Sequence, residues 1–220
     1  WALLSRDAGA SWSAPVPGPD TIHGGIELSS GGFLVAAYRE ERGAIGLWEA
    51  TSHDPLAWRK AGTLPLPAVP GIHFGEPHVV ELPSGRVIMM LRATADPYDD
   101  ASDRNVLWLT WSDDAGKSWA EVRPTPLWGF PPHLARLSDG RILCTYGHRR
   151  PPYGQRACVS EDGLTWRPDR EVVLRSDADS GDLGYPASVE IAPGRMLTVY
   201  YQAPPEQSKP CIWGTYWELS

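Results

Sequence analysis

The stretch Ser112-Asp113-Asp114-Ala115-Gly116-Lys117-Ser118-Trp119 decides the fold, because the chain contains its pattern more than once. The pattern S-x-D-x-G-x-S-W recurs in full at residues 5–12, and shorter versions occupy residues 160–166 and 52–58. A phrase that returns at long intervals indicates one structural unit that has been copied along the chain.

A second phrase alternates with this turn phrase and consists of a glycine turn followed by an apolar run. Its four copies begin at Glu27, Glu81, Arg136 and Glu190, so successive copies start 54 or 55 residues apart. Glycine supplies the positive φ that a tight hairpin needs, and the β-rich runs on each side supply two strands. Each unit is therefore predicted to read strand, hairpin, strand, loop, strand, turn phrase, strand.

Four antiparallel strands in about 50 residues are the size of one propeller blade. The predicted fold is an all-β propeller that forms a single domain over residues 1–220. In the turn phrase, the aspartate can accept backbone N–H groups and the tryptophan can fill the space between neighbouring sheets. The 22 glycines and 22 prolines interrupt every amphipathic helical pattern, which excludes a doubly wound α/β fold.

Charge and hydropathy exclude two classes of partner. A net charge of -7 argues against nucleic acid, which requires a basic face. The chain contains no run of 18 apolar residues, so no membrane span is expected. The chain opens at Trp1 inside a repeat and shows no signal peptide, so we expect an N-terminally truncated piece.

The three cysteines, Cys144, Cys158 and Cys211, are odd in number. Cys144 and Cys158 could lie on neighbouring strands of one blade. Buried, reduced thiols are the expectation for all three.

The turn phrase resembles the Asp-box, or BNR repeat, of the sialidase (neuraminidase) superfamily, and the resemblance covers the whole chain. It implies a six-bladed β-propeller, of which this chain would supply about four to five blades. The remainder would lie upstream of Trp1, or partner chains or blade swapping would complete the ring.

The resemblance extends to residues that carry chemistry. The phrase from Gly75 to Gly85 resembles a sialidase strand phrase and implies Glu76 as the catalytic base, with Arg92 in the clamp for the substrate carboxylate. The phrase Gly184-Tyr185-Pro186-Ala187-Ser188 resembles the one that carries the nucleophile, which implies that role for Tyr185.

The resemblance also implies a second clamp arginine shortly before a turn phrase. Arg156 is the best match, with Arg149 and Arg150 as less favoured substitutes. Starts of inner strands converge on the central axis, so His23 and His133 are candidate ligand contacts. Asp182, three residues before Tyr185, is a candidate acid or acceptor for a sugar hydroxyl.

These residue types suit an acidic sugar. A sialic acid carries a carboxylate on its anomeric carbon, which repels a carboxylate nucleophile but not a neutral phenol. A tyrosine with a pKa near 10 needs a base to take its proton, and arginine forks bind a carboxylate in a bidentate manner. The resemblance therefore implies a retaining exo-glycosidase that removes a terminal acidic sugar from glycans.

Four departures from the family pattern leave other functions open. The family's first clamp arginine and its acid/base aspartate are not identifiable here, and Pro186 follows the tyrosine. The family's late glutamate, about 16 residues after the tyrosine, is replaced by a stretch with no carboxylate, Val199-Tyr200-Tyr201-Gln202. Another sugar, or a propeller that binds carbohydrate without cleaving it, is the alternative. A protein-interaction propeller would require large exposed apolar patches.

No cofactor or metal is expected, because the oxygen ligands of a calcium loop and the Cys and His spacing of a zinc site are absent. The aspartates of the turn phrase are expected to be structural. The segment 96–104 reads as an exposed loop that either rims the pocket or is simply solvated. The family acts on extracellular glycans, which implies a secreted or periplasmic protein, and this piece alone is expected to be inactive.

Overall fold

The computed structural model describes residues 1–41, 43–203 and 209–219. Within these ranges the chain forms fifteen β-strands and no α-helix, and a short 3-10 turn at Pro168–Arg170 interrupts them. The strands form four antiparallel sheets, so the predicted all-β class is confirmed.

Each sheet is built from strands that are consecutive in the chain. Sheet 1 contains β1 (Ile26–Glu27), β2 (Gly32–Glu41), β3 (Ala44–Thr51) and β4 (Arg59–Pro65). Sheet 2 contains β5 (Ile72–Glu81), β6 (Val87–Ala95), β7 (Val106–Ser112) and β8 (Arg123–Trp128). Sheet 3 contains β9 (Pro132–Arg136), β10 (Ile142–His148), β11 (Gly154–Ser160) and β12 (Val172–Arg175). Sheet 4 contains β13 (Leu183–Ala192), β14 (Arg195–Gln202) and β15 (Cys211–Glu218).

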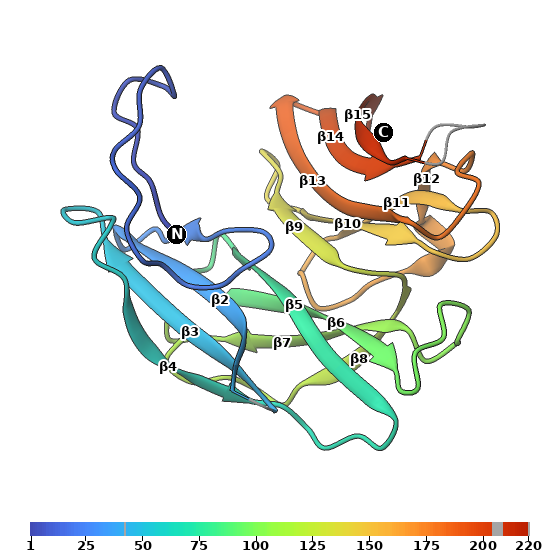
Figure 1. The fold of residues 1–220 in the computed structure, drawn as a ribbon, viewed down its shortest axis with the longest axis horizontal. Coiled ribbons are helices and arrows are strands. Elements are labelled where there is room, and N and C mark those ends of the chain that lie inside the picture. The colour runs from blue at the N-terminus through green and yellow to red at the C-terminus, as the bar shows by residue number, and fades with distance from the viewer. Residues whose placement is uncertain (42, 204–208, 220) are drawn as a thin grey trace.

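The sheets follow one another along an arc, as propeller blades do (Figure 1). Strand β5 contacts both β2 and β9, and β9 in turn contacts β13, so the first strands of sheets 2 to 4 lie side by side. An isolated bridge between Ala2 and Val16 precedes sheet 1. The ends of these neighbouring first strands hold the candidate site.

The turn phrase forms a closed hydrogen-bond network at residues 112–119. The Asp114 carboxylate accepts bonds from the backbone N–H of Ser118 at 2.8 Å and from its hydroxyl at 2.6 Å. Ser112 Oγ donates to Asp114 at 2.7 Å and accepts the N–H of Gly116 at 2.8 Å. Asp7 and Asp162 make the corresponding bonds in their own turns, so the three aspartates hold the turns in shape.

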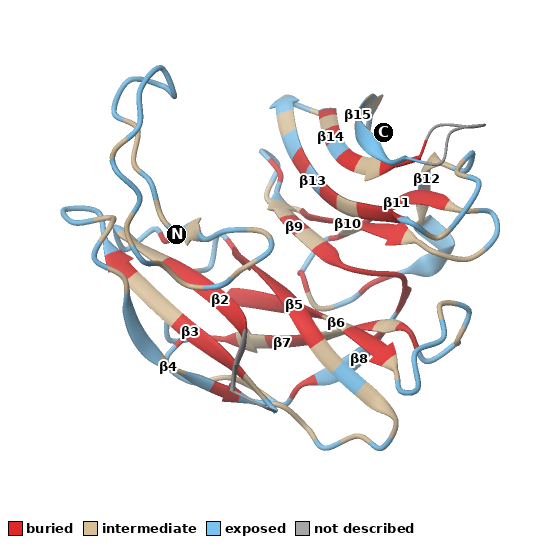
Figure 2. Ribbon diagram, in the orientation of Figure 1, coloured by how far each residue is buried: buried red, intermediate tan, exposed pale blue. Residues whose placement is uncertain are grey.

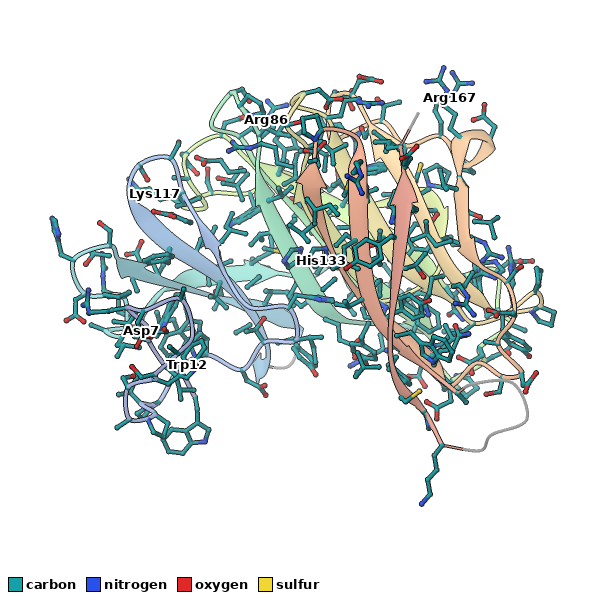
Figure 3. The ribbon with its side chains drawn as sticks, turned by 90° about the horizontal axis from the view of Figure 1, so that it is seen from above. Asp7, Trp12, Arg86, Lys117, His133 and Arg167 are labelled. Atoms are coloured by element: carbon teal, nitrogen blue, oxygen red, sulfur yellow. The ribbon has the colours of Figure 1, made fainter. Side chains whose placement is uncertain are left out.

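The tryptophan of the turn phrase packs between sheets where a neighbouring sheet is present. Trp166 is 4% exposed and packs with Ile88 and Met90 of sheet 2. Trp12, in the first copy, is 61% exposed and projects with Asp7 from the N-terminal segment (Figure 3). Burial of this tryptophan therefore depends on the sheet beside it and not on the turn alone.

The outer face of sheet 4 repeats the pattern of a buried face. Val80 of sheet 2 pairs with Ile88 and lies in the core against sheet 3, whereas Val189 of sheet 4 pairs with Leu197 and is 53% exposed. Figure 2 shows the change from the mostly buried β5 and β6 to the more exposed strands of sheet 4. Apolar positions alternate along β13 as in the other sheets, but nothing in the described chain covers them.

Cys144 and Cys158 face each other on β10 and β11, as predicted, and both are buried free thiols. Burial raises the pKa of the Cys144 thiol well above its ordinary value. Cys211 is free and exposed, contrary to the expectation that it is buried. Among the described residues, no helix is long and apolar enough to cross a membrane.

Candidate active site

Glu76 lies near the middle of β5, at a point where the strand pairing is irregular. The register of β5 against β6 shifts between Gly75 and His78, and Glu76 has a φ of 45°. A non-glycine residue in this left-handed region is uncommon, and such strain clusters at functional sites. The irregularity re-aims the Glu76 carboxylate out of the regular strand alternation.

Tyr185 repeats this arrangement in sheet 4. The register of β13 against β14 shifts between Gly184 and Ala187, and Tyr185 has a φ of 50°. Gly75 pairs with Arg92, and Gly184 pairs with Tyr201, so Glu76 and Tyr185 occupy the same position of two copied units. The same local distortion therefore presents a carboxylate from one sheet and a phenol from another.

The two side chains meet directly. The Tyr185 hydroxyl donates to Glu76 Oε1 at 2.7 Å, across 109 residues of sequence. Arg92 Nη1 donates to the other oxygen, Glu76 Oε2, at 2.8 Å. Glu76 is buried, so the carboxylate is held between a phenol and a guanidinium with little access for water. A phenol bonded to a fixed carboxylate has its proton acceptor already in place.

Burial is the largest influence on Tyr185, and with the hydrogen bond to Glu76 it raises the pKa of the phenol to about 12. Arg92 and Arg149 act in the opposite direction. Burial opposes the charge on Arg92, but the Glu76 carboxylate outweighs it and raises the pKa of that guanidinium. At neutral pH the site therefore holds a neutral phenol beside a fixed positive charge.

A second arginine approaches the same place from the segment after β10. The Arg149 guanidinium carbon lies 5.8 Å from the centroid of the Tyr185 ring and 5.2 Å from that of Phe130. The Arg92 guanidinium carbon lies 4.3 Å from the Phe130 centroid, so both cations flank one buried aromatic ring. Arg149 Nε is anchored on the carbonyl oxygen of Leu183 at 3.0 Å. Two guanidinium groups beside a neutral phenol offer charged donors to an anionic ligand.

Tyr201 extends the cluster on the side of sheet 4. Its ring centroid lies 5.9 Å from that of Tyr185, and its hydroxyl donates to Asp182 Oδ1 at 2.9 Å. Arg149 Nη2 lies 3.5 Å from the same hydroxyl. Asp182 is exposed and reaches the cluster through Tyr201, and no hydrogen bond joins it to Tyr185 or Glu76.

His23 and His133 meet each other and a third histidine, His78. The ring centroids lie 5.1 Å apart for His23 and His78, 5.6 Å for His23 and His133, and 4.5 Å for His78 and His133. The interior position of His133 is visible in Figure 3. His78 Nδ1 accepts the backbone N–H of Leu134 at 2.8 Å, which ties sheet 2 to sheet 3. His23 Nε2 is buried without a hydrogen-bond partner.

Burial keeps these three rings neutral. It lowers the pKa of His23 to about 4, and burial together with repulsion between the protonated forms of His23 and His133 lowers the pKa of His133 to about 3. It also lowers the pKa of His78 well below the ordinary value. Among the described residues, no group of three or more His, Cys, Asp or Glu side chains has an arrangement that could hold a metal ion.

The structure does not bring Arg156 into the cluster, and that expectation requires correction. Arg156 is 3% exposed, and its Nε lies 3.3 Å from Glu171 Oε1. Its Nη groups donate to three carbonyl oxygens, those of Gln155, Pro152 and Arg175. A guanidinium whose donors are occupied in this way fastens strands together, and Arg149, the substitute, lies beside Tyr185 instead.

Three members of the site were missed from the sequence: Tyr201, Phe130 and Tyr98. Tyr201 follows Tyr185 by the same 16 residues that separate Glu76 from Arg92, so the repeat spacing alone could have identified it. Phe130 carries no such signal. Tyr98 belongs to the segment 96–104, which the sequence predicted either to rim the pocket or to be exposed to solvent. Its side chain lines a groove that also contains Glu76 and Arg92.

Comparison of the sequence with known protein families identifies the family of the chain. Residues 1–197 match the BNR repeat-like domain, and the protein belongs to that family. No protein with a curated description matches the chain.

Solved structures share the fold. A protein of unknown function from Dyadobacter fermentans DSM 18053 is 27% identical, with a TM-score of 0.79 over 99% of this chain and 63% of that one. The NanB sialidase of Streptococcus pneumoniae is 17% identical, with a TM-score of 0.64 over 91% of this chain and 32% of that one. An α-L-arabinofuranosidase from Lactobacillus brevis is 12% identical, with a TM-score of 0.66 over 90% of this chain and 68% of that one. This chain therefore spans less than two thirds of the Dyadobacter protein.

Proposed function

We propose that this protein is a retaining exo-glycosidase that removes a terminal acidic sugar, of the sialic acid type, from a glycan. The observation that carries the proposal is the hydrogen bond from the Tyr185 hydroxyl to Glu76 Oε1 at 2.7 Å, with Arg92 on the other carboxylate oxygen. The membership in the BNR repeat-like family and the fold shared with a sialidase support it.

In the proposed reaction, the Tyr185 oxygen attacks the anomeric carbon as its proton passes to Glu76 Oε1. The bond from the anomeric carbon to the leaving oxygen breaks, and the leaving oxygen takes a proton from an acid that we do not assign in this chain. Water then attacks the tyrosyl-sugar intermediate and gives a proton to the conjugate base of the unassigned acid, while Glu76 returns its proton to the Tyr185 oxygen. Two displacements at one carbon retain its configuration.

Arg92 and Arg149 would bind the carboxylate of the sugar. Arg92 Nη2 makes no hydrogen bond within the described part of the chain, since Nε donates to Thr94 and Nη1 to Glu76. The Arg149 guanidinium also lies over the Phe130 ring. A carboxylate between two guanidinium groups gains charge-assisted hydrogen bonds. His23 and His133 would line the channel beside this position, and Asp182 would orient Tyr201.

The experiment uses the purified protein at its full natural length, because residues 1–220 alone are expected to be inactive. Its substrates are three fluorogenic aryl glycosides: an α-sialoside, a β-glucuronide and an α-L-arabinofuranoside. We expect turnover of the sialoside, with release of the sugar in its original anomeric form by NMR. Tyr185→Phe should lower the rate on the order of 10³-fold, because the nucleophile is lost. Tyr216→Phe is the matched control, because Tyr216 is an exposed tyrosine of β15 that lies outside the cluster.

Unchanged turnover in Tyr185→Phe would remove this residue as the nucleophile. Turnover of another glycoside, with the same dependence on Tyr185, would keep the mechanism and change the sugar. The absence of turnover together with measurable binding of sialic acid would favour the alternative, a propeller that binds carbohydrate without cleaving it.

A further inference from the structure

A large groove adjoins the Glu76 and Arg92 end of the candidate site. It has a volume of about 1070 Å³. Its walls come from Gly43 and the start of β3, the segment 66–70 between β4 and β5, the first half of β5, and the end of β6 with the following segment that carries Tyr98. Binding pockets for small ligands span roughly 300–1,000 Å³, so this groove is larger than one terminal sugar requires.

The groove is lined by both charged and apolar side chains. Glu76 and Arg92 are its residues from the candidate site, and Asp96 is a further charged group. Apolar and aromatic side chains make up much of the lining, among them Leu66, Val69, Ile72, Phe74 and Tyr98, with Thr94 and His73 as polar groups. Sugar rings have apolar C–H faces and polar edges, and an aromatic ring with a polar tip can contact both. The groove therefore suits a further sugar ring better than a second charged group.

The groove is built from segments that are fastened to each other. Asn105 is fully buried, accepts the N–H of Ala95 at 2.9 Å and donates to the carbonyl oxygens of Asp99 and Asp100. Arg104 Nη2 donates to the carbonyl oxygen of Pro70 at 2.5 Å, which ties the two walls together.

Gly71 makes this tie possible. Its φ is +68°, and a Cβ at this position would lie 2.7 Å from Arg104 Nη1. The Tyr98 hydroxyl is bonded to Asp100, so the ring is held at the edge of the groove. A groove that is formed before the ligand arrives loses less entropy on binding.

We propose that this groove binds the sugar unit that adjoins the reacting one, so that the natural substrate is an oligosaccharide, with Tyr98 as the residue that recognises this second unit. The proposal rests on the proposed function for the position of the reacting sugar. It goes beyond that function by assigning the neighbouring subsite and its recognition residue.

The test measures binding in the Tyr185→Phe background, which prevents turnover. Calorimetric titration compares N-acetylneuraminic acid with sialyllactose, in which the same acid is linked to further sugars. We expect sialyllactose to bind about ten-fold more tightly, as one stacked aromatic contact allows. Adding Tyr98→Ala should abolish this difference between the two probes, so that sialyllactose loses more affinity than the monosaccharide does, whereas Tyr98→Phe should retain the difference.

Tyr216→Ala is the matched control, because Tyr216 is an exposed tyrosine of sheet 4 that does not line the groove. Equal affinity for the two probes overturns the groove proposal alone, and the aryl glycoside assay still tests the proposed function. The groove proposal is also overturned if Tyr98→Phe loses as much affinity for sialyllactose as Tyr98→Ala does. In that case the hydroxyl contact with Asp100, and not the aromatic ring, would account for the binding. Failure of both probes to bind contradicts the acidic sugar and this proposal with it.

Discussion

Glu76 and Tyr185 stand at the same position of two copied sheets and are joined by a hydrogen bond of 2.7 Å, although sheet 3 lies between them in the chain. Both have a positive φ, 45° and 50°, inside an irregular first strand. The same irregularity in the first strand of two sheets therefore presents two different side chains to each other, a carboxylate and a phenol, which can exchange a proton.

Glu76→Gln should lower kcat by a factor on the order of 10²–10⁴, because the amide keeps the shape of the carboxylate but cannot take the proton of Tyr185. Steady-state kinetics with the aryl glycoside measure the change. Glu81→Gln is the control, because Glu81 is the last residue of the same strand and accepts bonds from Ser29 instead. A kcat that falls equally in both variants would mean that the effect comes from the strand and not from the chemistry.

Arg149→Ala should raise KM for an acidic substrate by roughly ten-fold to a hundred-fold, since a hydrogen bond to a charged group contributes about 1.5–3 kcal/mol. Arg150→Ala is the neighbouring control, because Arg150 pairs with Asp103 and packs over Trp128. If the two variants have the same KM, Arg149 does not contact the carboxylate of the substrate.

Arg156→Ala should destabilise the protein by about 3 kcal/mol while the kcat of the folded molecules stays within about two-fold, because it removes one partner of a buried pair. Glu171 would lose its ion pair, and three carbonyl oxygens would lose a donor. Thermal unfolding and active-site titration separate the two quantities. In Arg167→Ala, which breaks an exposed pair with Asp169, the Tm should hardly change. A specific loss of substrate binding in Arg156→Ala at unchanged Tm would restore this residue to the site.

The three histidines should make stability depend on pH in the range from about 6.5 to 4. Burial lowers the pKa of His23 to about 4 and of His133 to about 3, so below pH 6.5 the unfolded chain binds protons that the folded chain does not. The free energy of unfolding should therefore decrease as the pH is lowered. His23 accounts for about 3 kcal/mol of this decrease once the pH reaches the pKa of His23 in the folded protein. The turn aspartates, whose pKa values are lowered to about 2, act below pH 3.8 and do not interfere.

Urea unfolding at pH 7 and pH 4.5 checks this dependence in the original chain and in His23→Gln. The difference in unfolding free energy between the two pH values should be smaller in the variant. His53→Gln, at an exposed histidine of the shorter turn phrase at residues 52–58, should leave this difference unchanged. An identical pH dependence in all three proteins would contradict the role of the buried ring.

Trp166→Ala should cost about 3–5 kcal/mol, because it opens a cavity between sheets 2 and 3. Trp12→Ala changes the same position of another turn phrase, but its side chain is 61% exposed and little packing is lost. Chemical denaturation of the two variants measures the contrast. Equal losses would mean that the tryptophan acts within its own turn and not between sheets.

The repeat made much of the architecture predictable. The spacing of the glycine hairpins and turn phrases predicted four-stranded units, and the structure has such sheets with hairpins at residues 82–86 and 137–141. The same unit also allowed Cys144 and Cys158 to lie on neighbouring strands, and they face each other there as free thiols. These features depend on the residues of each turn and on the alternation of apolar and polar residues along a strand. Both can be recognised from residues that are close together in the sequence.

The second arginine of the carboxylate clamp could not be identified from the repeat spacing. Arg149, Arg150 and Arg156 lie within eight positions of one another, and sequence distance from a turn phrase favoured Arg156. The structure turns Arg156 toward Glu171 and Arg149 toward Tyr185. Which way a long side chain points depends on the partners that surround it, and those come from other sheets.

The sequence by itself determined the repeated unit, the all-β class and the residue types available for chemistry, because hairpins, turn phrases and strand alternation are short-range properties. Only the tertiary structure decided that Glu76, Arg92 and Tyr185 meet, that Arg149 joins them and that a groove opens beside them. The physical reason is that contacts between residues far apart in the chain are fixed by how whole sheets pack against one another, and no local pattern records that packing.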